Sequence, residues 1–326
     1  MTTQCDNPFA GDAGLEAVLT EHEPLAAHTW FGLGGPARWM ARPRDADQLT
    51  ELTRRCARAG LPLRVLGQGA NLLVGDDGVD GVVVRLDHQA FKRIEWPAPE
   101  GPQGQEVTVR AGAGADLGRL TLEAVRRGLA GLECMAGIPG TVGGAVRMNA
   151  GGRFGCIADV IRAVRVMHRD GRQAVVAREQ AGFAYRRSGL EDVLILEAEL
   201  ALRRDDPARL HERYREVWEA KRRTQPLREN SAGCVFKNPP GHSAGSLIDR
   251  AGLKGRKVGG AWVAREHANF IVAREGATAA DVLELIGQIR SEVSGRFGVD
   301  LELEIELWGC RSPQEAAAGS GGSGTA

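Results

Sequence analysis

Apolar residues recur every three to four positions in several stretches of the chain, the spacing of a helix with one buried face. The first of these stretches begins at Asp45, a plausible N-cap, and stops at Gly60. The helices expected from this spacing are residues 45–60, 116–128, 207–223 and about 278–297.

Shorter apolar or alternating runs predict strands between these helices. The expected strands are residues 63–67, 72–76, 81–86, 106–114, 161–167, 193–200, 267–273 and 301–307. A Pro- and Gly-rich stretch at 96–105 reads as a hairpin tip. The pattern therefore indicates a mixed α and β protein.

The two ends lack a clear period. We expect residues 1–20 to be a loose lead and the small, polar residues 310–326 to be a disordered tail. The composition turns polar near 203–207, so we place a domain boundary between residues 204 and 205. This gives a domain at 21–204 and a second at 205–309.

Composition narrows the classes of function. Lys plus Arg and Asp plus Glu both number 42 in 326 residues, and this balance argues against broad nucleic-acid binding. The six cysteines include no C-x-x-C pair, so we expect no metal site. The N-terminal residues have no export signal, and no apolar run is long enough to span a membrane, so we expect a cytoplasmic protein without membrane contact.

Glycine numbers 44, well above the usual share of roughly 7%, and it clusters. Residues 32–37 match the dinucleotide pattern G-x-G-x-x-A, but Pro43 would stop the helix that this fold requires. Residues 67–71 (GQGAN) follow a strand and suit either an anion nest or an ordinary tight turn.

Residues 137–152 (GIPGTVGGAVRMNAGG) contain six glycines and a single charge, Arg147. A surface loop would be more polar, so close approach of the backbone to a flat or phosphorylated ligand is favoured. The alternative is a tightly packed helix entry that starts near Thr141.

Together these loops resemble the flavin-binding domain of the UDP-N-acetylenolpyruvoylglucosamine reductase family. HTWFGLGGPA precedes them, and the later motifs follow in the family's order: FAYRRS, SAGCVFKNP, AGLKG, HANFIV and GVDLELEIELWG. The likeness covers about residues 22–309. Because the segment between Arg186 and Cys234 is short, the chain is similar to the class that lacks an extra loop with a substrate-binding tyrosine.

The resemblance implies an α+β fold: a two-lobed FAD-binding domain of the vanillyl-alcohol oxidase type at 21–204, and a C-terminal α+β substrate-binding domain. It implies that NADPH reduces bound FAD, which then reduces the enolpyruvyl group of UDP-N-acetylglucosamine enolpyruvate to give UDP-N-acetylmuramate for peptidoglycan. Related flavoproteins attach the flavin covalently through a His or Cys side chain of the phosphate loop. Positions 68 and 70 hold Gln and Ala, so we expect non-covalent FAD. We also expect a monomer.

The same resemblance assigns residues to roles. The catalytic residues would be Arg186, Cys234 and Glu304. The substrate would be bound by Tyr185, Arg222, Lys237, Asn238 and Lys254. The cofactor would be bound by Thr29, Gly67, Gln68, Gly69, Ala70, Asn71, Leu72, Gly137, Ile138, Pro139, Gly140, Gly143, Gly144, Ala145, Asn149 and Gly151.

Three positions depart from the family pattern. Cys234 stands where the family has a serine proton donor, Ala70 replaces a serine of the phosphate loop, and Arg274 replaces a frequent asparagine. A thiol gives up a proton more readily than a hydroxyl, so the exchange at Cys234 is chemically permissive.

Local pattern alone leaves other interpretations open. Arg186 beside Arg187 could be a surface arginine, and Glu304 would share a solvent face with Glu302 and Glu306 in an alternating strand. His267 could be a core histidine. The alternatives for the whole chain are another FAD-dependent oxidoreductase on the same fold and a flavin-binding module without catalysis.

Overall fold

The computed structural model describes residues 7–310, and these form two compact units. Both units are discontinuous in sequence. The first contains residues up to 21, 39–67 and 81–221, and the second contains residues 22–38, 68–80 and those from 222 onward. The boundary expected at 204/205 therefore differs from the division by contacts. The expected tail lies outside the described residues, apart from Cys310.

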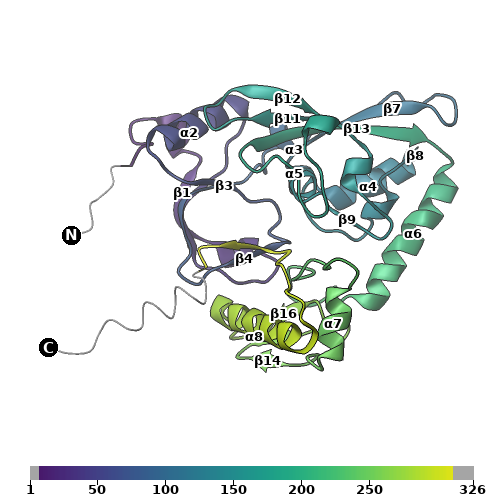
Figure 1. The fold of residues 1–326 in the computed structure, drawn as a ribbon. Helices are drawn as coiled ribbons and strands as arrows, with labels where there is room; N and C mark the ends of the chain where they lie inside the picture. The colour runs from purple at the N-terminus through teal and green to yellow at the C-terminus, as the bar shows by residue number, and fades with distance from the viewer. Residues whose placement is uncertain (1–6, 311–326) are drawn as a thin grey trace. The chain divides into compact units, whose positions relative to one another are not determined.

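The first unit is built on an antiparallel sheet in the order β12-β11-β13-β7-β6, with β8 also paired to β13. In Figure 1 helices α4 and α5 lie on one side of this sheet, and α5 contacts β13 and β7. The sheet strands are β6 (Ile94–Glu95), β7 (Glu106–Gly112), β8 (Leu129–Ala130), β11 (Ile161–Met167), β12 (Gln173–Ala177) and β13 (Leu194–Arg204).

The other elements of this unit are short, except for three helices. They are α1 (Ala13–Glu16), α2 (Ala46–Arg58), β3 (Leu63–Val65), α3 (Gln89–Lys92), α4 (Leu117–Arg126), α5 (Val142–Arg147), β9 (Gly151–Gly152), β10 (Gly155–Cys156) and α6 (Pro207–Thr224), whose last residues belong to the second unit. A further sheet has the strand order β1-β2-β5-β3. Three of its strands have residues in both units: β1 (Leu19–Pro24), β2 (Pro36–Ala41) and β5 (Val79–Val84).

The second unit packs α8 against a three-stranded antiparallel sheet, and Figure 1 shows α8 in yellow-green beside β14 and β16. A separate parallel pair joins β17 to β4. The elements are β4 (Leu72–Val74), α7 (Ala244–Arg250), β14 (Lys257–Val258), β15 (Ala261–Val263), β16 (Ile271–Ala273), α8 (Ala279–Phe297) and β17 (Glu306–Trp308).

Helix α8 shows why the local sequence signals work. The Thr278 hydroxyl accepts a hydrogen bond from the backbone N–H of Asp281, and the Asp281 carboxylate accepts one back from the N–H of Thr278. This capping box satisfies amides that a helix start leaves without partners. Gly298 ends the helix at φ +66°, a left-handed conformation that glycine adopts without strain. Its buried face is Val282, Leu285, Ile286, Ile289 and Val293, at helical spacing.

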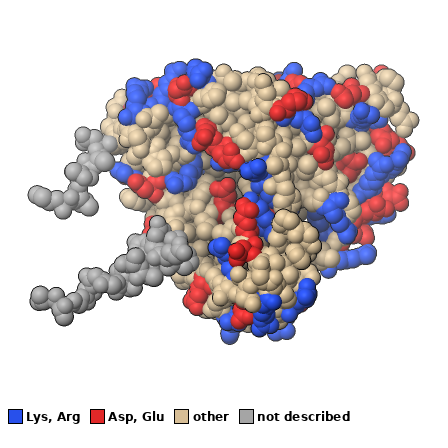
Figure 2. All heavy atoms as spheres, in the orientation of Figure 1, with Lys and Arg blue, Asp and Glu red and all other residues tan. Residues whose placement is uncertain are grey.

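Basic and acidic side chains are mixed over the face of the molecule drawn in Figure 2. Ion pairs also join neighbouring strands of the sheet in the first unit. Arg110 lies 3.2 Å from Glu199, and Arg165 lies 3.2 Å from Glu197. Within residues 7–310, no helix is both long enough and apolar enough to cross a membrane.

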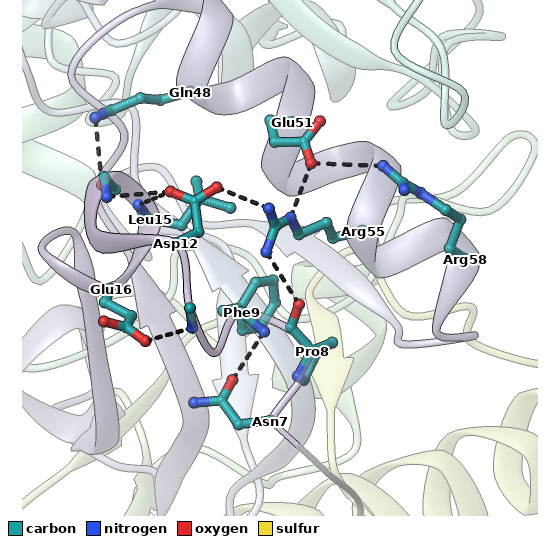
Figure 3. A network of polar contacts seen from close by, with 12 residues as sticks. Asn7, Pro8, Phe9, Asp12, Leu15, Glu16, Gln48, Glu51, Arg55 and Arg58 are labelled. Carbon is teal, nitrogen blue, oxygen red and sulfur yellow. Dashed lines mark hydrogen bonds and ion pairs between the residues drawn. The ribbon is translucent and has the colours of Figure 1, made fainter.

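Residues 7–20, the described part of the expected loose lead, are packed against the first unit; residues 1–6 lie outside the described residues. Phe9 is completely buried, and its ring meets the ring of Trp39 edge-on at 5.7 Å between centroids. Figure 3 shows the polar contacts around it: Arg55 of α2 donates hydrogen bonds to Asp12 at 2.7 Å and to the carbonyl of Pro8 at 3.4 Å. A single aromatic anchor and an arginine hold this segment, and neither produces a periodic pattern.

We predict that Phe9→Ala lowers the free energy of unfolding by about 3–5 kcal/mol, because the substitution leaves a cavity against Trp39. Urea denaturation measures this change. The matched control is Phe154→Ala, since Phe154 is 42% exposed and its loss should cost less than about 1 kcal/mol. Equal stability of the two variants would contradict a packed N-terminal segment.

Candidate active site

The two glycine loops meet within the first unit. An added Cβ at Gly67 would lie 2.9 Å from the hydroxyl of Thr141, so the start of the 67–72 loop packs directly on residue 141. Thr141 is the N-cap of α5, and its hydroxyl accepts a hydrogen bond from the Gly144 N–H at 3.2 Å. Gly67, the first residue of the 67–72 loop, is therefore adjacent to the second glycine segment.

A third small-residue run, which the sequence analysis did not single out, supports the glycine segment. The Val142 N–H donates to the carbonyl of Ala115 at 2.9 Å, and the Gly143 N–H donates to the carbonyl of Ala113 at 2.8 Å. An added Cβ at Gly143 would lie 2.9 Å from the Cβ of Ala113. The signal was present as GAGAD between a strand and a helix, but it matched no known phosphate-loop pattern.

Two glycines of the segment face open space instead. Gly140 has φ +138°, and no atom lies within 4 Å of where its Cβ would be. An added Cβ at Gly144 would meet only the Thr141 hydroxyl, at 3.5 Å. At Gly140 and Gly144 the segment thus presents bare backbone beside open space, the arrangement that a flat cofactor such as FAD needs for close approach. In the same segment Ile138 is half-buried, Ala145 is buried and Pro139 is exposed.

The remainder of the 67–72 loop belongs to the second unit. Gly69 has φ +65°, and an added Cβ there would overlap the carbonyl of His28 and lie 2.8 Å from the Cα of Thr29. Its own carbonyl accepts a hydrogen bond from the Trp30 N–H at 3.1 Å. Gln68 and Ala70 are half-buried, and Leu72 is buried. Packing against residues 28–30 is therefore sufficient reason for glycine at position 69.

Thr29 is buried and donates its hydroxyl to the carbonyl of Leu33 at 2.8 Å. Because Thr29 also touches the Gly69 turn, the predicted cofactor residues of this unit form one group.

Tyr185 and Arg186 are the two central residues of a tight turn in the first unit. The backbone groups of Ala184 and Arg187 bond each other in both directions, at 3.0 and 3.2 Å. Arg186 has φ +57°, a conformation rare for residues other than glycine and asparagine. The Arg186 Nη1 donates to the carbonyl of Gly151 at 2.7 Å, so its guanidinium folds back onto the glycine segment. Tyr185 is 54% exposed.

Cys234 and Glu304 lie on neighbouring segments of the second unit. Cys234 pairs with Phe270 in an antiparallel bridge, and the next residue, Val235, accepts a hydrogen bond from the Glu304 N–H at 2.8 Å. The side-chain amide of Asn71 donates to the Glu304 carbonyl at 3.0 Å. The structure therefore joins the end of the predicted phosphate loop to both predicted catalytic segments of this unit.

The expected strand over 301–307 is wrong in its extent. Only Glu306–Trp308 forms a strand, paired in parallel with β4, and Phe236 and Leu303 form a single bridge. As a result Glu302 and Glu306 are exposed while Glu304 is half-buried. The three glutamates do not share one solvent face, which favours a distinct role for Glu304.

The predicted substrate residues of the C-terminal segment have partners in the protein. Lys237 pairs with Glu302, and Lys254 pairs with Asp249 at 2.7 Å. Asn238 accepts a hydrogen bond from the Ala244 N–H at 2.9 Å, which helps to begin α7. Arg222 is exposed on α6. Lys237 and Asn238 follow Cys234 by three and four positions in the chain, and the substrate-binding roles of these four residues stay predictions.

His267 packs in the second unit as a core side chain would. Its ring meets that of Phe270 edge-on at 4.9 Å between centroids. Burial lowers the pKa of His267, and the positive charge of Lys254 adds to this effect. A neutral, packed ring fits the core interpretation better than a charged ligand contact.

Lys221 is a residue that sequence reasoning missed. Its ammonium group donates to the carbonyl of Ala136 at 2.6 Å and to that of Cys134 at 3.4 Å, just before the glycine segment begins at Gly137. Burial lowers the pKa of Lys221 to about 8, and the charge of Arg186 acts in the same direction. Nothing in the run KRRT distinguishes this lysine from its exposed neighbours, so the sequence offered no signal.

No group of three or more His, Cys, Asp or Glu side chains in the described part of the chain is arranged to hold a metal ion.

Comparison with known proteins identifies similar domains. The model described as an FAD binding domain matches residues 37–177, and the model described as the C-terminal domain of UDP-N-acetylenolpyruvoylglucosamine reductase matches residues 225–308. A UDP-N-acetylenolpyruvoylglucosamine reductase of Moorella thermoacetica is 45% identical over 91% of this chain and 95% of its own. UDP-N-acetylenolpyruvoylglucosamine reductase 2 of Symbiobacterium thermophilum is 45% identical over 88% and 91%.

A crystal structure of UDP-N-acetylenolpyruvylglucosamine reductase from Thermus caldophilus superimposes with a TM-score of 0.75 at 42% identity, covering 89% of this chain and 98% of that one. The expected fold class, an FAD-binding domain with a C-terminal α+β domain, is confirmed by these matches. FAD as the cofactor is confirmed with it.

We predict that Gly144→Val abolishes FAD binding while the apoprotein still folds. The protein itself leaves room for a side chain at this position, so only the cofactor should be displaced. Gly140→Val should also abolish FAD binding, but its positive φ adds backbone strain of roughly 1–3 kcal/mol. Flavin absorbance of the purified variants and titration of the apoproteins with FAD give the measurement.

Gly287→Val is the matched control, because Gly287 is also a helical glycine with open space around it. This variant should bind FAD as the parent does. Full flavin occupancy in Gly144→Val would show that the cofactor lies elsewhere.

Proposed function

The chain belongs to the UDP-N-acetylenolpyruvoylglucosamine reductase family, and we propose that Arg186, Cys234 and Glu304 carry the reduction of the enolpyruvyl group of UDP-N-acetylglucosamine enolpyruvate. The product is UDP-N-acetylmuramate, a precursor of peptidoglycan, and NADPH is the reductant. The chain is of the class without the extra tyrosine loop.

The observation that carries this proposal is the hydrogen bond between Asn71 and the carbonyl of Glu304. Asn71 closes the loop expected to hold the flavin phosphates, and Glu304 is bonded through its N–H to Val235, the neighbour of Cys234. A cofactor loop, a candidate acid and a candidate proton donor thus belong to one hydrogen-bonded cluster in a single unit.

The substrate sets the chemical tasks. Its double bond is an enol ether conjugated to a carboxylate, so addition of hydride at the terminal carbon drives negative charge onto the carboxylate as an enolate. When bound, FAD would supply this hydride, with NADPH as its reductant. The protein must stabilise the growing charge and deliver a proton to the adjacent carbon.

Arg186 suits the first task. A guanidinium stays charged at all relevant pH values and presents a planar fork that matches a carboxylate. Because its backbone turn and its bond to Gly151 are both fixed, little reorganisation is needed when charge develops.

Cys234 suits the second task as the proton donor, in the position of the family serine. Its main-chain neighbours are held by Phe270 and by Glu304, so the thiol has a defined place. Glu304, half-buried beside this segment, has a supporting role as an acid or as an orienting group.

The remaining assignments are part of the proposal. FAD binds without a covalent bond to the residues of the two glycine loops and to Thr29, and the open backbone at Gly140 and Gly144 supports this placement. The substrate is bound by Tyr185, Arg222, Lys237, Asn238 and Lys254. The FAD domain at 21–204 and the substrate domain at 205–309 are functional divisions. We further propose a monomer that works in the cytoplasm, where NADPH and nucleotide sugars are available.

Anaerobic half-reactions test the activity. We expect a yellow protein that NADPH bleaches and that UDP-N-acetylglucosamine enolpyruvate reoxidises. A protein that NADPH bleaches but the sugar cannot reoxidise would favour another flavin-dependent oxidoreductase. A yellow protein that NADPH cannot bleach would favour a non-catalytic flavin module.

We predict that Arg186→Ala slows reoxidation by the sugar roughly 10²–10³-fold, the usual effect of losing a preorganised charge donor. Reduction of FAD by NADPH should be spared, because no charge develops at the substrate carboxylate in that step. Stopped-flow absorbance of the flavin measures both half-reactions. Equal damage to both would indicate a structural role for Arg186.

We predict that Cys234→Ser remains substantially active, whereas Cys234→Ala is bleached by NADPH but turns over poorly. Alkylation of Cys234 should inactivate the enzyme unless substrate is bound. Steady-state assays, with mass spectrometry of the alkylated peptides, test these outcomes. Parental turnover in Cys234→Ala would assign proton donation to another group or to water.

The four other thiols in the described residues have raised pKa values, which disfavours their alkylation; mass spectrometry then identifies the modified cysteine. Burial raises the pKa of Cys56 to about 12 and the pKa values of Cys134 and Cys310 to about 11. Burial also raises the pKa of Cys156, with Asp159 adding to the shift. At pH 7–8 these thiols remain protonated, and a protonated thiol is a poor nucleophile.

A further inference from the structure

Asn149 is bonded through both ends of its side-chain amide to other parts of the first unit. Its Nδ2 donates to the carbonyl of Ala184 at 2.9 Å, and its Oδ1 accepts from the N–H of Ala158 at 3.2 Å. The residue is only 8% exposed. Asn149 is one of the predicted cofactor residues, and because both polar atoms of its side chain bind the protein, we assign the side chain a role within the protein.

The carbonyl of Ala184 is the first carbonyl of the turn that carries Arg186. It accepts two hydrogen bonds, one from the Arg187 N–H that closes the turn and one from Asn149. The Arg186 guanidinium returns to Gly151, two residues beyond Asn149. The residues around Asn149 therefore fix both the backbone of this turn and the end of the arginine side chain.

The turn needs such support because Arg186 is in a left-handed conformation at φ +57°. A residue other than glycine is strained in this conformation, which persists only when its surroundings enforce it. Ser188 supplies a second brace, since its buried hydroxyl donates to the carbonyl of Arg147 at 2.8 Å. Both braces join the turn to the end of α5.

Asn149 also ends helix α5, and this second role must be separated from the first. Its N–H donates to the carbonyl of Val146 at 3.2 Å, and the N–H of Ala150 donates to that of Ala145 at 2.8 Å, the two bonds of a Schellman cap. Asn149 has φ +43°, the left-handed position that glycine fills in most such caps. Glycine would serve the cap equally well but cannot bond Ala184, so the cap alone does not require asparagine.

We propose that Asn149 is a positioning residue for Arg186: its side-chain amide holds the turn that aims the guanidinium at the substrate carboxylate. This rests on the role proposed above for Arg186. Reduction of the cofactor by NADPH does not depend on this alignment, whereas substrate binding and reoxidation by the sugar do.

Asn149→Gly is the primary test, because it keeps the cap and removes both side-chain bonds. We expect reoxidation by the sugar to slow roughly 10- to 100-fold, the scale of a misplacement of about 1 Å at a reacting group. The affinity of the oxidised enzyme for the enolpyruvyl sugar, measured by perturbation of the flavin spectrum, should fall as well. FAD affinity and reduction by NADPH should match those of the parent, whereas the thermal unfolding midpoint should fall, because the buried N–H of Ala158 loses its partner.

A pair of double-mutant cycles identifies the residue through which Asn149 acts. Added to Arg186→Ala, Asn149→Gly should slow reoxidation by less than about 2-fold further, because the guanidinium to be positioned is gone. Added to Cys234→Ala, it should retain its full effect. The second cycle is the matched control, since it combines the same substitution with a different impaired residue.

Asn149→Asp provides an independent variant. An ionised carboxylate keeps an acceptor for Ala158 but repels the carbonyl of Ala184, whereas a protonated carboxyl can donate to that carbonyl. Reoxidation by this variant should therefore recover as pH falls, while that of Asn149→Gly, which has no group to protonate, should show no such recovery.

Three results would overturn the proposal. Unchanged reoxidation in Asn149→Gly would mean that the residue only ends the helix. A loss of FAD affinity, with full additivity to Arg186→Ala, would make Asn149 a cofactor ligand. Reoxidation at the parental rate in Arg186→Ala would contradict the role of Arg186 and this inference with it. Slow reoxidation in Arg186→Ala together with the parental rate in Asn149→Gly would contradict this inference alone.

Discussion

Close approach of one backbone to another, possible only at glycine, determines where the loops of this protein lie. Gly143 packs on Ala113, and Gly151 lies against the backbone of Cys156, so that a side chain at either position would collide with a neighbour. At Gly140 and Gly144 the added atom would enter open space. The glycine-rich composition thus has two causes, internal packing and room for a ligand, and the structure separates them residue by residue.

The elements with strong local signals were predictable. Helix α8 begins with a capping box and ends with a left-handed glycine, and its expected range of about 278–297 agrees with Ala279–Phe297. Strand β11 matches its prediction at Ile161–Met167. The strand predicted over 301–307 was too long, because alternating residues form a strand only where a neighbouring strand is available to pair with them. Its partner β4 is more than two hundred residues earlier and pairs only with Glu306–Trp308.

The division of the chain into two units could not be predicted from the sequence either, because it depends on contacts between distant segments. Composition changes at the start of α6, but contacts place most of this helix in the first unit, where Lys221 bonds the carbonyls of Cys134 and Ala136. Asn149 likewise bonds a residue 35 positions away in the chain, and Lys221 bonds one 85 positions away. The sequence could name Arg186, Cys234 and Glu304 through resemblance, but the residues that hold them are defined by partners that no local pattern reveals.

The exchange of serine for cysteine at position 234 is easier to understand from the way the segment is held. The side chain of Asn269, which is 3% exposed, bonds Phe236 twice, accepting from its N–H at 3.0 Å and donating to its carbonyl at 2.7 Å. Val235 donates its N–H to the carbonyl of Asn269 at 2.8 Å and accepts from Glu304. Leaving such buried polar groups without partners costs about 1–3 kcal/mol each, so this frame resists displacement. None of these bonds involves the side chain of residue 234. A serine or a cysteine is therefore carried on the same backbone, so the exchange of the proposed proton donor leaves the position of the residue unchanged.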